Sequence, residues 1–244
     1  MAKVFESWTV LPHEPLEKHG ENLWTVGGKM PNGKTPRVMT VARLRSGKLL
    51  IHNAIALEEP LMAEMLAFGE PAALLVPNGF HRQDAKIYKQ RFPEIKVYCP
   101  KGSTKKVSEV VPVDGDYSAV PRDETVQVRY VEGCKVVEGM LEIRSVDGIS
   151  LVFNDLICNM PKLGGAGGFF LAPTGRPSVP RVSRWMIVKD KRVFGDTLLR
   201  LAALPKLRRL IVSHGAIIAD NPGAVLRDVA QELMGQVQSA RQAA

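Results

Sequence analysis

Five side chains of types that bind metal ions or transfer protons are of interest in this sequence, most of them just after short apolar runs. They are His52, His81, Cys134, Asp155 and His214. Histidine, cysteine and aspartate all bind zinc, and a hydrolytic zinc site needs about three such ligands with one position open for water. Histidine also exchanges protons near neutral pH. Since loops at strand ends often carry function, these residues are the candidates for a site.

The first half of the sequence contains the elements expected to position His52 and His81. Alternating or apolar runs predict strands, with a hairpin turn at 45–47. Helical spacing of apolar residues precedes the stop at Gly69 and predicts a helix there. A strand, helix, strand order follows and indicates a βαβ unit with parallel strands. The predicted strands are 23–26, 37–44, 48–52, 72–76 and 95–98, and the predicted helices are 61–68 and 83–92.

The second half supplies strand ends for Asp155 and His214. It predicts strands at 125–130, 140–144, 149–153 and 210–213, and helices at 182–188, 194–204 and 222–237. Gly164 to Gly168 is expected to be a loop, either a lid over the strand ends or a plain connector. Apolar side chains in the first two of these helical stretches are expected to face the core, namely Trp185, Met186, Val193, Phe194 and Leu198.

The composition is that of a globular protein. The chain has 244 residues, 45% hydrophobic and 24% charged, enough to form one large α/β domain over residues 1–244. No apolar run approaches the length of a membrane span, and the first residues do not read as a signal peptide. Three widely spaced cysteines do not suggest a disulfide framework. We therefore expect a cytoplasmic protein.

Positive charge is concentrated between Pro161 and Ile211. This segment has eleven Lys or Arg and two acids, a net charge of +9, within a chain of net charge +8. Such an excess can attract nucleic acid, anionic lipid or an acidic partner, although a solvated helical face is the simpler interpretation. The residues expected to contact an anionic partner are Arg181, Arg184, Lys189, Lys191, Arg192, Arg208 and Arg209.

The order of elements and the residues at the strand ends resemble the metallo-β-lactamase superfamily over roughly residues 22–218. The resemblance is to a degenerate branch of that superfamily, in which Pro-Asn-x-x-His replaces the H-x-H-x-D-H motif. Here the replacement is Pro77-Asn78-Gly79-Phe80-His81. The resemblance implies an α/β fold of the α+β kind, a four-layer αββα sandwich with its site on loops at strand ends.

Two alignments of this loop with H-x-H-x-D-H are open. One places Asn78 and Phe80 at the first two histidines, with Arg82 at the aspartate and Gln83 at the last histidine. The other places His81 at the second histidine and Asp84 at the last. Neither restores the motif, and Asn78 and Phe80 are poor zinc ligands, so the resemblance implies that a two-metal site is lost.

The other ligand positions of the superfamily are better matched. Asp155 corresponds to the bridging aspartate and His214 to the last histidine, while Cys134 stands near the position of another histidine. The resemblance thus implies a single-metal site of Asp155, His214 and either Cys134 or His81. Thiolate, imidazole and carboxylate all suit zinc or iron. His52 stands where an aspartate is common in the superfamily. The resemblance implies that either His81 or His52 acts as general base or orients the substrate.

Three functions remain open from the sequence. The first is a hydrolase with one divalent ion (zinc, iron or manganese), in which Asp155, His214, His81 and His52 are catalytic. The second is a metal-free descendant of the fold that binds a small-molecule ligand or a partner. The third is binding of nucleic acid or anionic lipid by the basic segment 161–211, which would weaken steeply with salt.

Overall fold

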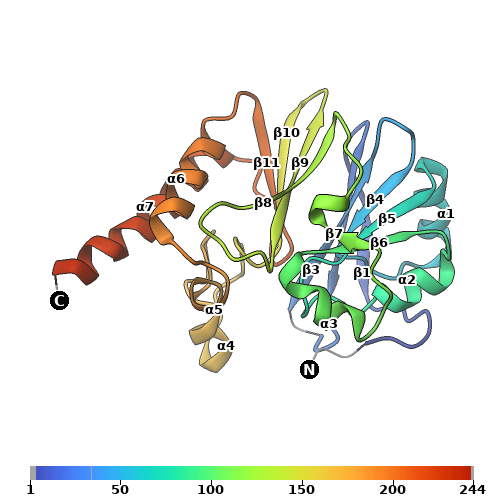
Figure 1. Ribbon diagram of the computed structural model, residues 1–244, viewed down its shortest axis with the longest axis horizontal. Helices are drawn as coiled ribbons and strands as arrows, with labels where there is room; N and C mark the ends of the chain where they lie inside the picture. The colour runs from blue at the N-terminus through green and yellow to red at the C-terminus, as the bar shows by residue number, and fades with distance from the viewer. Residues whose placement is uncertain (1–3, 34, 243–244) are drawn as a thin grey trace.

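The computed structural model describes residues 4–33 and 35–242 and contains two β-sheets that pack against each other (Figure 1). The larger sheet has its strands in sequence order, antiparallel from the first to the fourth and parallel from the fourth onward. Its strands are β1 (His13–Gly20), β2 (Leu23–Lys29), β3 (Pro36–Arg43), β4 (Leu49–His52), β5 (Pro71–Leu75), β6 (Lys96–Cys99) and β7 (Gly115–Asp116).

The smaller sheet has the order β11-β10-β9-β8, and only its β10–β11 pair is parallel. The strands are β8 (Val126–Tyr130), β9 (Gly139–Ser145), β10 (Gly148–Phe153) and β11 (Leu207–Val212). The backbone N–H of Val38 in β3 donates to the carbonyl of Ser213, 3.0 Å away, just after β11. This bond joins the two sheets at the edge where β5, β10 and β11 end.

Helices cover the outer face of each sheet (Figure 1). On the larger sheet these are α1 (Glu59–Phe68), α2 (Ala85–Arg91) and the short α3 (Thr104–Ser108), which follows the 3₁₀ turn η1 (Lys101–Ser103). A second 3₁₀ turn, η2 (Tyr117–Ala119), follows β7. On the smaller sheet they are α6 (Lys191–Ala202) and α7 (Pro222–Gln242), and the short α4 (Gly165–Phe170) and α5 (Arg181–Met186) lie near its end. The expected αββα sandwich is confirmed.

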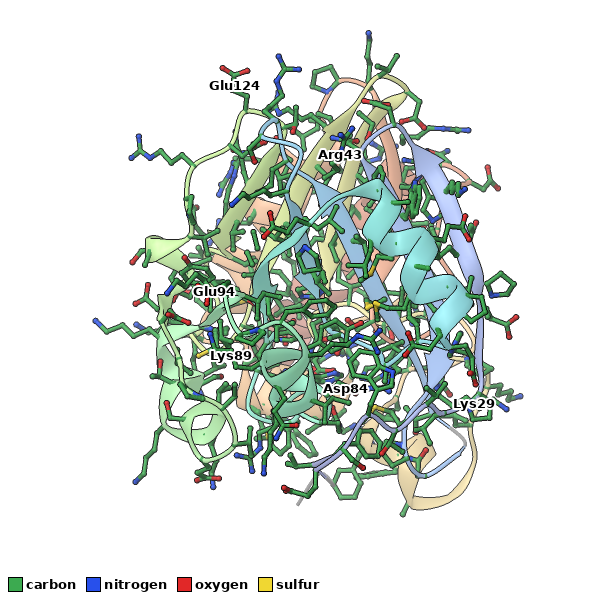
Figure 2. The ribbon with its side chains drawn as sticks, turned by 90° about the vertical axis from the view of Figure 1, so that its right-hand side faces the viewer. Lys29, Arg43, Asp84, Lys89, Glu94 and Glu124 are labelled. Atoms are coloured by element: carbon green, nitrogen blue, oxygen red, sulfur yellow. The ribbon has the colours of Figure 1, made fainter. Side chains whose placement is uncertain are left out.

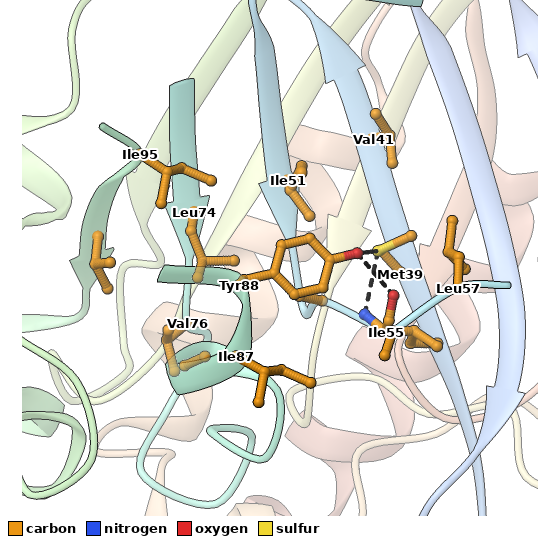
Figure 3. Packing of buried hydrophobic residues seen from close by; sticks show 14 of the residues in the cluster. Met39, Val41, Ile51, Ile55, Leu57, Leu74, Val76, Ile87, Tyr88 and Ile95 are labelled. Carbon is orange, nitrogen blue, oxygen red and sulfur yellow. Dashed lines mark hydrogen bonds between the residues drawn. The ribbon is translucent and has the colours of Figure 1, made fainter. Parts of the chain in front are cut away.

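Three apolar clusters hold these layers together, one under each helical layer and one between the sheets. Under α2, the fully buried Tyr88 packs on Ile51 and Leu74, and its hydroxyl donates to the Ile55 carbonyl, 2.7 Å away (Figure 3). Alternation along β3 turns Met39 and Val41 toward this cluster and Val38 toward the other sheet. No described helix is both long and apolar enough to cross a membrane.

Most predicted elements form, and the differences have physical reasons. β1 escaped prediction because it is a charged strand containing Pro15, with its residues half-buried or exposed at the sheet edge. The glycine stretch expected to be a loop forms the short helix α4. Phe194 and Leu198 are fully buried as expected, but Trp185, Met186 and Val193 are 59%, 49% and 40% exposed. In α5 the face turned inward carries Ser183 instead.

A buried ion pair fixes β3 to the start of α2. The guanidinium of Arg37 lies 2.5 Å from Oδ2 of Asp84, and both side chains are 1% exposed. Oδ1 of Asp84 accepts from the backbone N–H of Ala56, 3.0 Å away. Figure 2 shows the outer face of the larger sheet, where Asp84 precedes α2. Burial raises the pKa of Asp84 in spite of the facing guanidinium, so the pair carries a large desolvation cost.

We expect Arg37→Met to lower the free energy of unfolding by about 3–5 kcal/mol, because it leaves the Asp84 carboxylate buried without its partner. Urea denaturation of the variant measures this loss. The control is Lys96→Met, which breaks the exposed Lys96–Asp114 pair and should cost no more than about 1 kcal/mol. Equal losses in the two variants would contradict the assignment.

Candidate functional site

The ends of three strands bring His81, Asp155 and His214 together. His81 follows β5, Asp155 follows β10 and His214 follows β11. Nε2 of His81 lies 3.1 Å from Nε2 of His214, and Oδ1 of Asp155 lies 3.3 and 3.2 Å from these two nitrogens. The three side chains are mostly buried. One carboxylate oxygen therefore lies within hydrogen-bonding distance of two imidazole nitrogens, which lie equally close to each other.

Asn78 shapes the loop that delivers His81. Its Oδ1 accepts from the backbone N–H groups of Phe80 and His81, at 2.8 and 3.2 Å, which folds the loop into a tight turn. Its Nδ2 donates to Oδ2 of Asp155, 2.7 Å away. The turn directs His81 inward and leaves Phe80 61% exposed. His81 is thus the residue of this loop that joins the cluster.

Hydrogen bonds to oxygen acceptors orient both imidazole rings. Nδ1 of His214 lies 2.7 Å from the Pro36 carbonyl, which only accepts, so Nδ1 carries the hydrogen. Nδ1 of His81 lies 3.1 Å from Oδ1 of Asn53, whose Nδ2 donates to the Val38 carbonyl. Asn53 sits at φ 56°, in the left-handed region that asparagine tolerates. Both Nε2 atoms are thereby turned toward Asp155.

Gly215 lets the loops after β10 and β11 approach closely. It has φ +116°, and a Cβ there would lie 1.9 Å from the carbonyl oxygen of Asn159. The backbone N–H of Asn159 donates to the His214 carbonyl at 2.9 Å. A side chain at position 215 would separate the two loops and with them Asp155 and His214. This glycine is a steric requirement of the cluster.

The pKa values of the three side chains are shifted in different directions. Burial alone would raise the pKa of Asp155, but the two histidines more than offset it and hold this pKa well below its usual range. Burial would lower the pKa of His214, but the bond to Asp155 raises it overall. Burial dominates at His81, and its pKa is lowered. The carboxylate is therefore ionised and favours a positive charge beside it, on His214 or on a bound cation.

The three donor atoms fit a divalent ion. Bonds of about 2.0–2.1 Å in a tetrahedral site place neighbouring donors about 3.3 Å apart, and the observed separations are 3.1, 3.2 and 3.3 Å. Two imidazoles and one carboxylate are a donor set used by zinc and by non-haem iron. The Nδ1 hydrogens that bond to outer oxygens are the usual second contact of metal-binding histidines. Among the described residues, this is the one cluster of three or more such side chains.

Glu138 is a site residue that sequence reasoning missed. It is 0% exposed, and its Oε1 accepts from the backbone N–H of Leu156 at 2.8 Å. Its Oε2 lies 3.3 Å from Nδ2 of Asn78, the same amide that holds Asp155. Burial, with the nearby Asp155, raises the pKa of Glu138 well above its usual range. A lone glutamate after the apolar pair Val136-Val137 was the only sequence signal for it.

Cys134 and Asp84 lie outside the cluster. Cys134 forms a backbone bridge with Val188, and burial raises the pKa of its thiol far above the neutral range, which disfavours the thiolate that zinc binds. The structure thus places His81, not Cys134, with Asp155 and His214. Asp84 is paired with Arg37. The alignment that places Asp84 at the last histidine of H-x-H-x-D-H therefore brings His81, but not Asp84, into the cluster.

His52 lies next to the cluster but not in it. It ends β4, pairs with Thr40 of β3, and is 2% exposed. Its buried Nδ1 has no hydrogen-bond partner among the described residues. Burial, with a smaller contribution from His81, lowers its pKa to about 3. An imidazole with this pKa stays neutral and is a weak proton acceptor at pH 7.

The basic segment is partly neutralised by acids from elsewhere. Arg209 is buried and pairs with Asp147, and Arg208 lies 3.9 Å from the same carboxylate. Arg184 pairs with Glu232 at 2.9 Å. Arg181 donates to the Phe169 carbonyl and stacks on the Phe169 ring. Of the seven candidates, three have side chains that form no ion pair or hydrogen bond with the described residues, namely Lys189, Lys191 and Arg192.

The pKa of His52 predicts acid sensitivity. The folded protein keeps His52 neutral down to about pH 3, whereas the unfolded chain takes up its proton near pH 6.5. Stability should therefore fall as pH drops from about 6.5, by up to about 1.4 kcal/mol per pH unit from this group. Urea denaturation of chelator-treated protein between pH 6.5 and 4 should give a shallower dependence for His52→Gln. Parallel curves for the two proteins would contradict this.

Comparison with solved structures identifies the fold. DIM-1 metallo-β-lactamase has a TM-score of 0.60 at 15% identity, covering 92% of this chain and 99% of that one. FIM-1 from Pseudomonas aeruginosa, in its mono-zinc form, has a TM-score of 0.58 at 12% identity, covering 91% and 96%. The metallo-β-lactamase from Pontibacter korlensis has a TM-score of 0.57 at 10% identity, covering 90% and 99%.

Similarity in sequence is much weaker. No protein-family model matches the chain, and no curated protein matches it in sequence. The structural matches nevertheless extend over about nine-tenths of the chain. The expected resemblance is confirmed at the level of architecture. This chain has the metallo-β-lactamase fold.

Proposed function

We propose that the protein is a hydrolase with a single divalent ion held by His81, Asp155 and His214. The observation that carries this proposal is the convergence of two imidazole nitrogens and one carboxylate oxygen within 3.3 Å of one another. When bound, such an ion lowers the pKa of a coordinated water toward about 7 and polarises a carbonyl or phosphoryl oxygen.

The residues of the chain prepare the site for that chemistry. The ionised Asp155 attracts the cation, and Asn78 holds its other oxygen so that Oδ1 faces the histidines. Asn53 and Pro36 keep both Nε2 atoms directed inward. A cavity of about 510 Å³ includes His81 and Asp155 in its wall, so a substrate there would reach the cluster.

Metal-free ligand binding is the second candidate, favoured by the charges of the cluster. The raised pKa of His214 and the ionised Asp155 give a compensated ion pair without any metal. A protein of this kind would use the same cavity for a ligand. Metal content separates the two candidates.

The first test is elemental analysis of untagged protein purified without chelators. We expect about one ion of zinc, iron or manganese per chain. His81→Ala, Asp155→Ala and His214→Ala should each lose it, because each removes one of three protein ligands. Cys134→Ala and His13→Ala are the controls and should retain it, since both residues lie outside the cluster. A folded protein without metal would exclude the metal-dependent hydrolase and favour metal-free ligand binding.

Removing the support of His81 should weaken the site without removing a ligand. Asn53→Gly keeps the left-handed backbone accessible and deletes the amide that accepts from His81. We expect metal affinity to fall about 10–100-fold, as for other outer contacts of metal ligands. Competition with a fluorescent chelator measures this affinity. An unchanged affinity would show that Asn53 does not orient the ring.

A further inference from the structure

The cavity beside the cluster has an apolar wall. It lies between the Asn78–His81 loop, the η1–α3 segment and the α5 segment, and its volume is about 510 Å³. This volume is within the range of small-molecule sites. The apolar side chains of its wall include Phe80, Val137, Leu171, Val182, Met186 and Ile187.

The polar side chains of the wall, other than those at the cluster, are already engaged. The Ser103 hydroxyl donates to the Val137 carbonyl at 2.9 Å, and the Ser183 hydroxyl donates to the Asp155 carbonyl at 2.6 Å. Lys106 is the one cation in the wall as the structure describes it, and its ammonium lies 3.1 Å from Glu109 with the side chain 59% exposed. Polar contacts to a ligand are thus concentrated at His81, Asp155 and Asn78.

This distribution discriminates between classes of substrate. A phosphate monoester or diester keeps its negative charge in the site and calls for arginine or lysine around it. The wall offers only the exposed, paired Lys106. An uncharged ester instead needs polar contacts at the carbonyl alone and apolar surface for the rest of the molecule.

Apolar surface continues outward from the cavity. Phe80 and Met186 line it and are 61% and 49% exposed, and Trp185, next to Met186, is 59% exposed. The helix α4, which precedes the cavity residue Leu171, carries two further exposed rings, the T-shaped pair Phe169–Phe170, with the Arg181 guanidinium over Phe169. Exposed apolar side chains gathered at a cavity mark a binding surface. They would shelter the part of a long ligand that the cavity does not enclose.

We propose that the cavity binds the acyl chain of a medium-chain carboxylic ester, with the ester carbonyl at the His81–Asp155–His214 cluster. The assignment of a substrate rests on the proposed hydrolase function. In the reaction, the oxygen of water forms a bond to the carbonyl carbon and the bond from that carbon to the alkoxy oxygen breaks. The alkoxy oxygen leaves with one proton of the water as an alcohol, and the acid remains, releasing its own proton at neutral pH.

The test uses the product side of this reaction, the saturated carboxylates from butanoate to decanoate, with binding measured by calorimetry. If the chain enters the cavity, affinity should rise about fourfold for each added methylene until the cavity is full, which corresponds to about 0.8 kcal/mol each. Affinity that does not depend on chain length would overturn the proposal.

Matched variants locate the chain. Met186→Glu places a charge in the cavity wall and should weaken octanoate binding at least tenfold. Val146→Glu makes a comparable change at an 86% exposed residue in the β9–β10 turn, away from the cavity, and should leave octanoate binding unchanged. Equal effects of the two substitutions would show that binding is not in the cavity.

Carboxylate binding by chelator-treated protein separates this proposal from the metal proposal. The apolar wall does not require an ion, so the chelated protein should keep the dependence on chain length while losing affinity for every carboxylate by a common factor. Metal binding without chain-length dependence would overturn the acyl site and leave the metal site intact. Chain-length dependence in a protein that binds no metal would support the acyl site and overturn the hydrolase.

Discussion

The geometry of the site depends on the contacts that the Asp155 carboxylate makes with His81, His214 and Asn78. Its Oδ1 faces both histidines and its Oδ2 accepts from Asn78, so a single side chain contacts the loops after β5 and β11. A buried carboxylate without such partners would be strongly unfavourable. The positions of His81, His214 and Asn78 are therefore mutually dependent, and Glu138 and Gly215 belong to the same constraint because they hold the adjoining backbone.

The fold positions these groups through the parallel parts of its sheets. β4 and β5 are parallel neighbours in one sheet, and β10 and β11 in the other, so their carboxyl ends meet at one edge. That edge is where ligand sites of open α/β sheets generally form. The Arg37–Asp84 pair lies just behind it and ties β3 to the start of α2. The short stretch from Asn78 to Asp84 thus contains both a member of the cluster, His81, and residues that hold the fold around it.

Sequence patterns predicted the layers better than the site. Apolar periodicity located most strands because burial dictates it. Asp155 and His214, which follow β10 and β11, were implied by the resemblance to the metallo-β-lactamase superfamily. The third member was ambiguous between His81 and Cys134, since the turn made by Asn78 depends on a tertiary bond to Asp155. Glu138 and Asn53 were missed for the same reason. Their partners are distant in sequence, and neither residue type belongs to a recognised motif.

The exposed apolar residues of α5 show a second limit of sequence patterns. Trp185 and Met186 read as core residues because helical periodicity cannot distinguish a face toward the core from a face toward solvent or a cavity. Met186 lines the cavity and Trp185 is exposed. Charge patterns mislead in the same way. Arg209 contributes to the basic excess in sequence, yet in the structure it is buried against Ser150 and Asp147. Composition reports what a segment contains, whereas function depends on which groups remain available at its surface.

The separation of the site residues along the chain couples the site to folding. His81 and His214 are 133 residues apart and belong to different sheets, yet their Nε2 atoms lie 3.1 Å apart. An ion held between them would bind the folded chain alone, because its ligands meet only when both sheets have formed. Binding to the folded state alone at a hundredfold excess over Kd adds about 2.7 kcal/mol to stability. The concentration of free metal would then set how firmly the two sheets stay together.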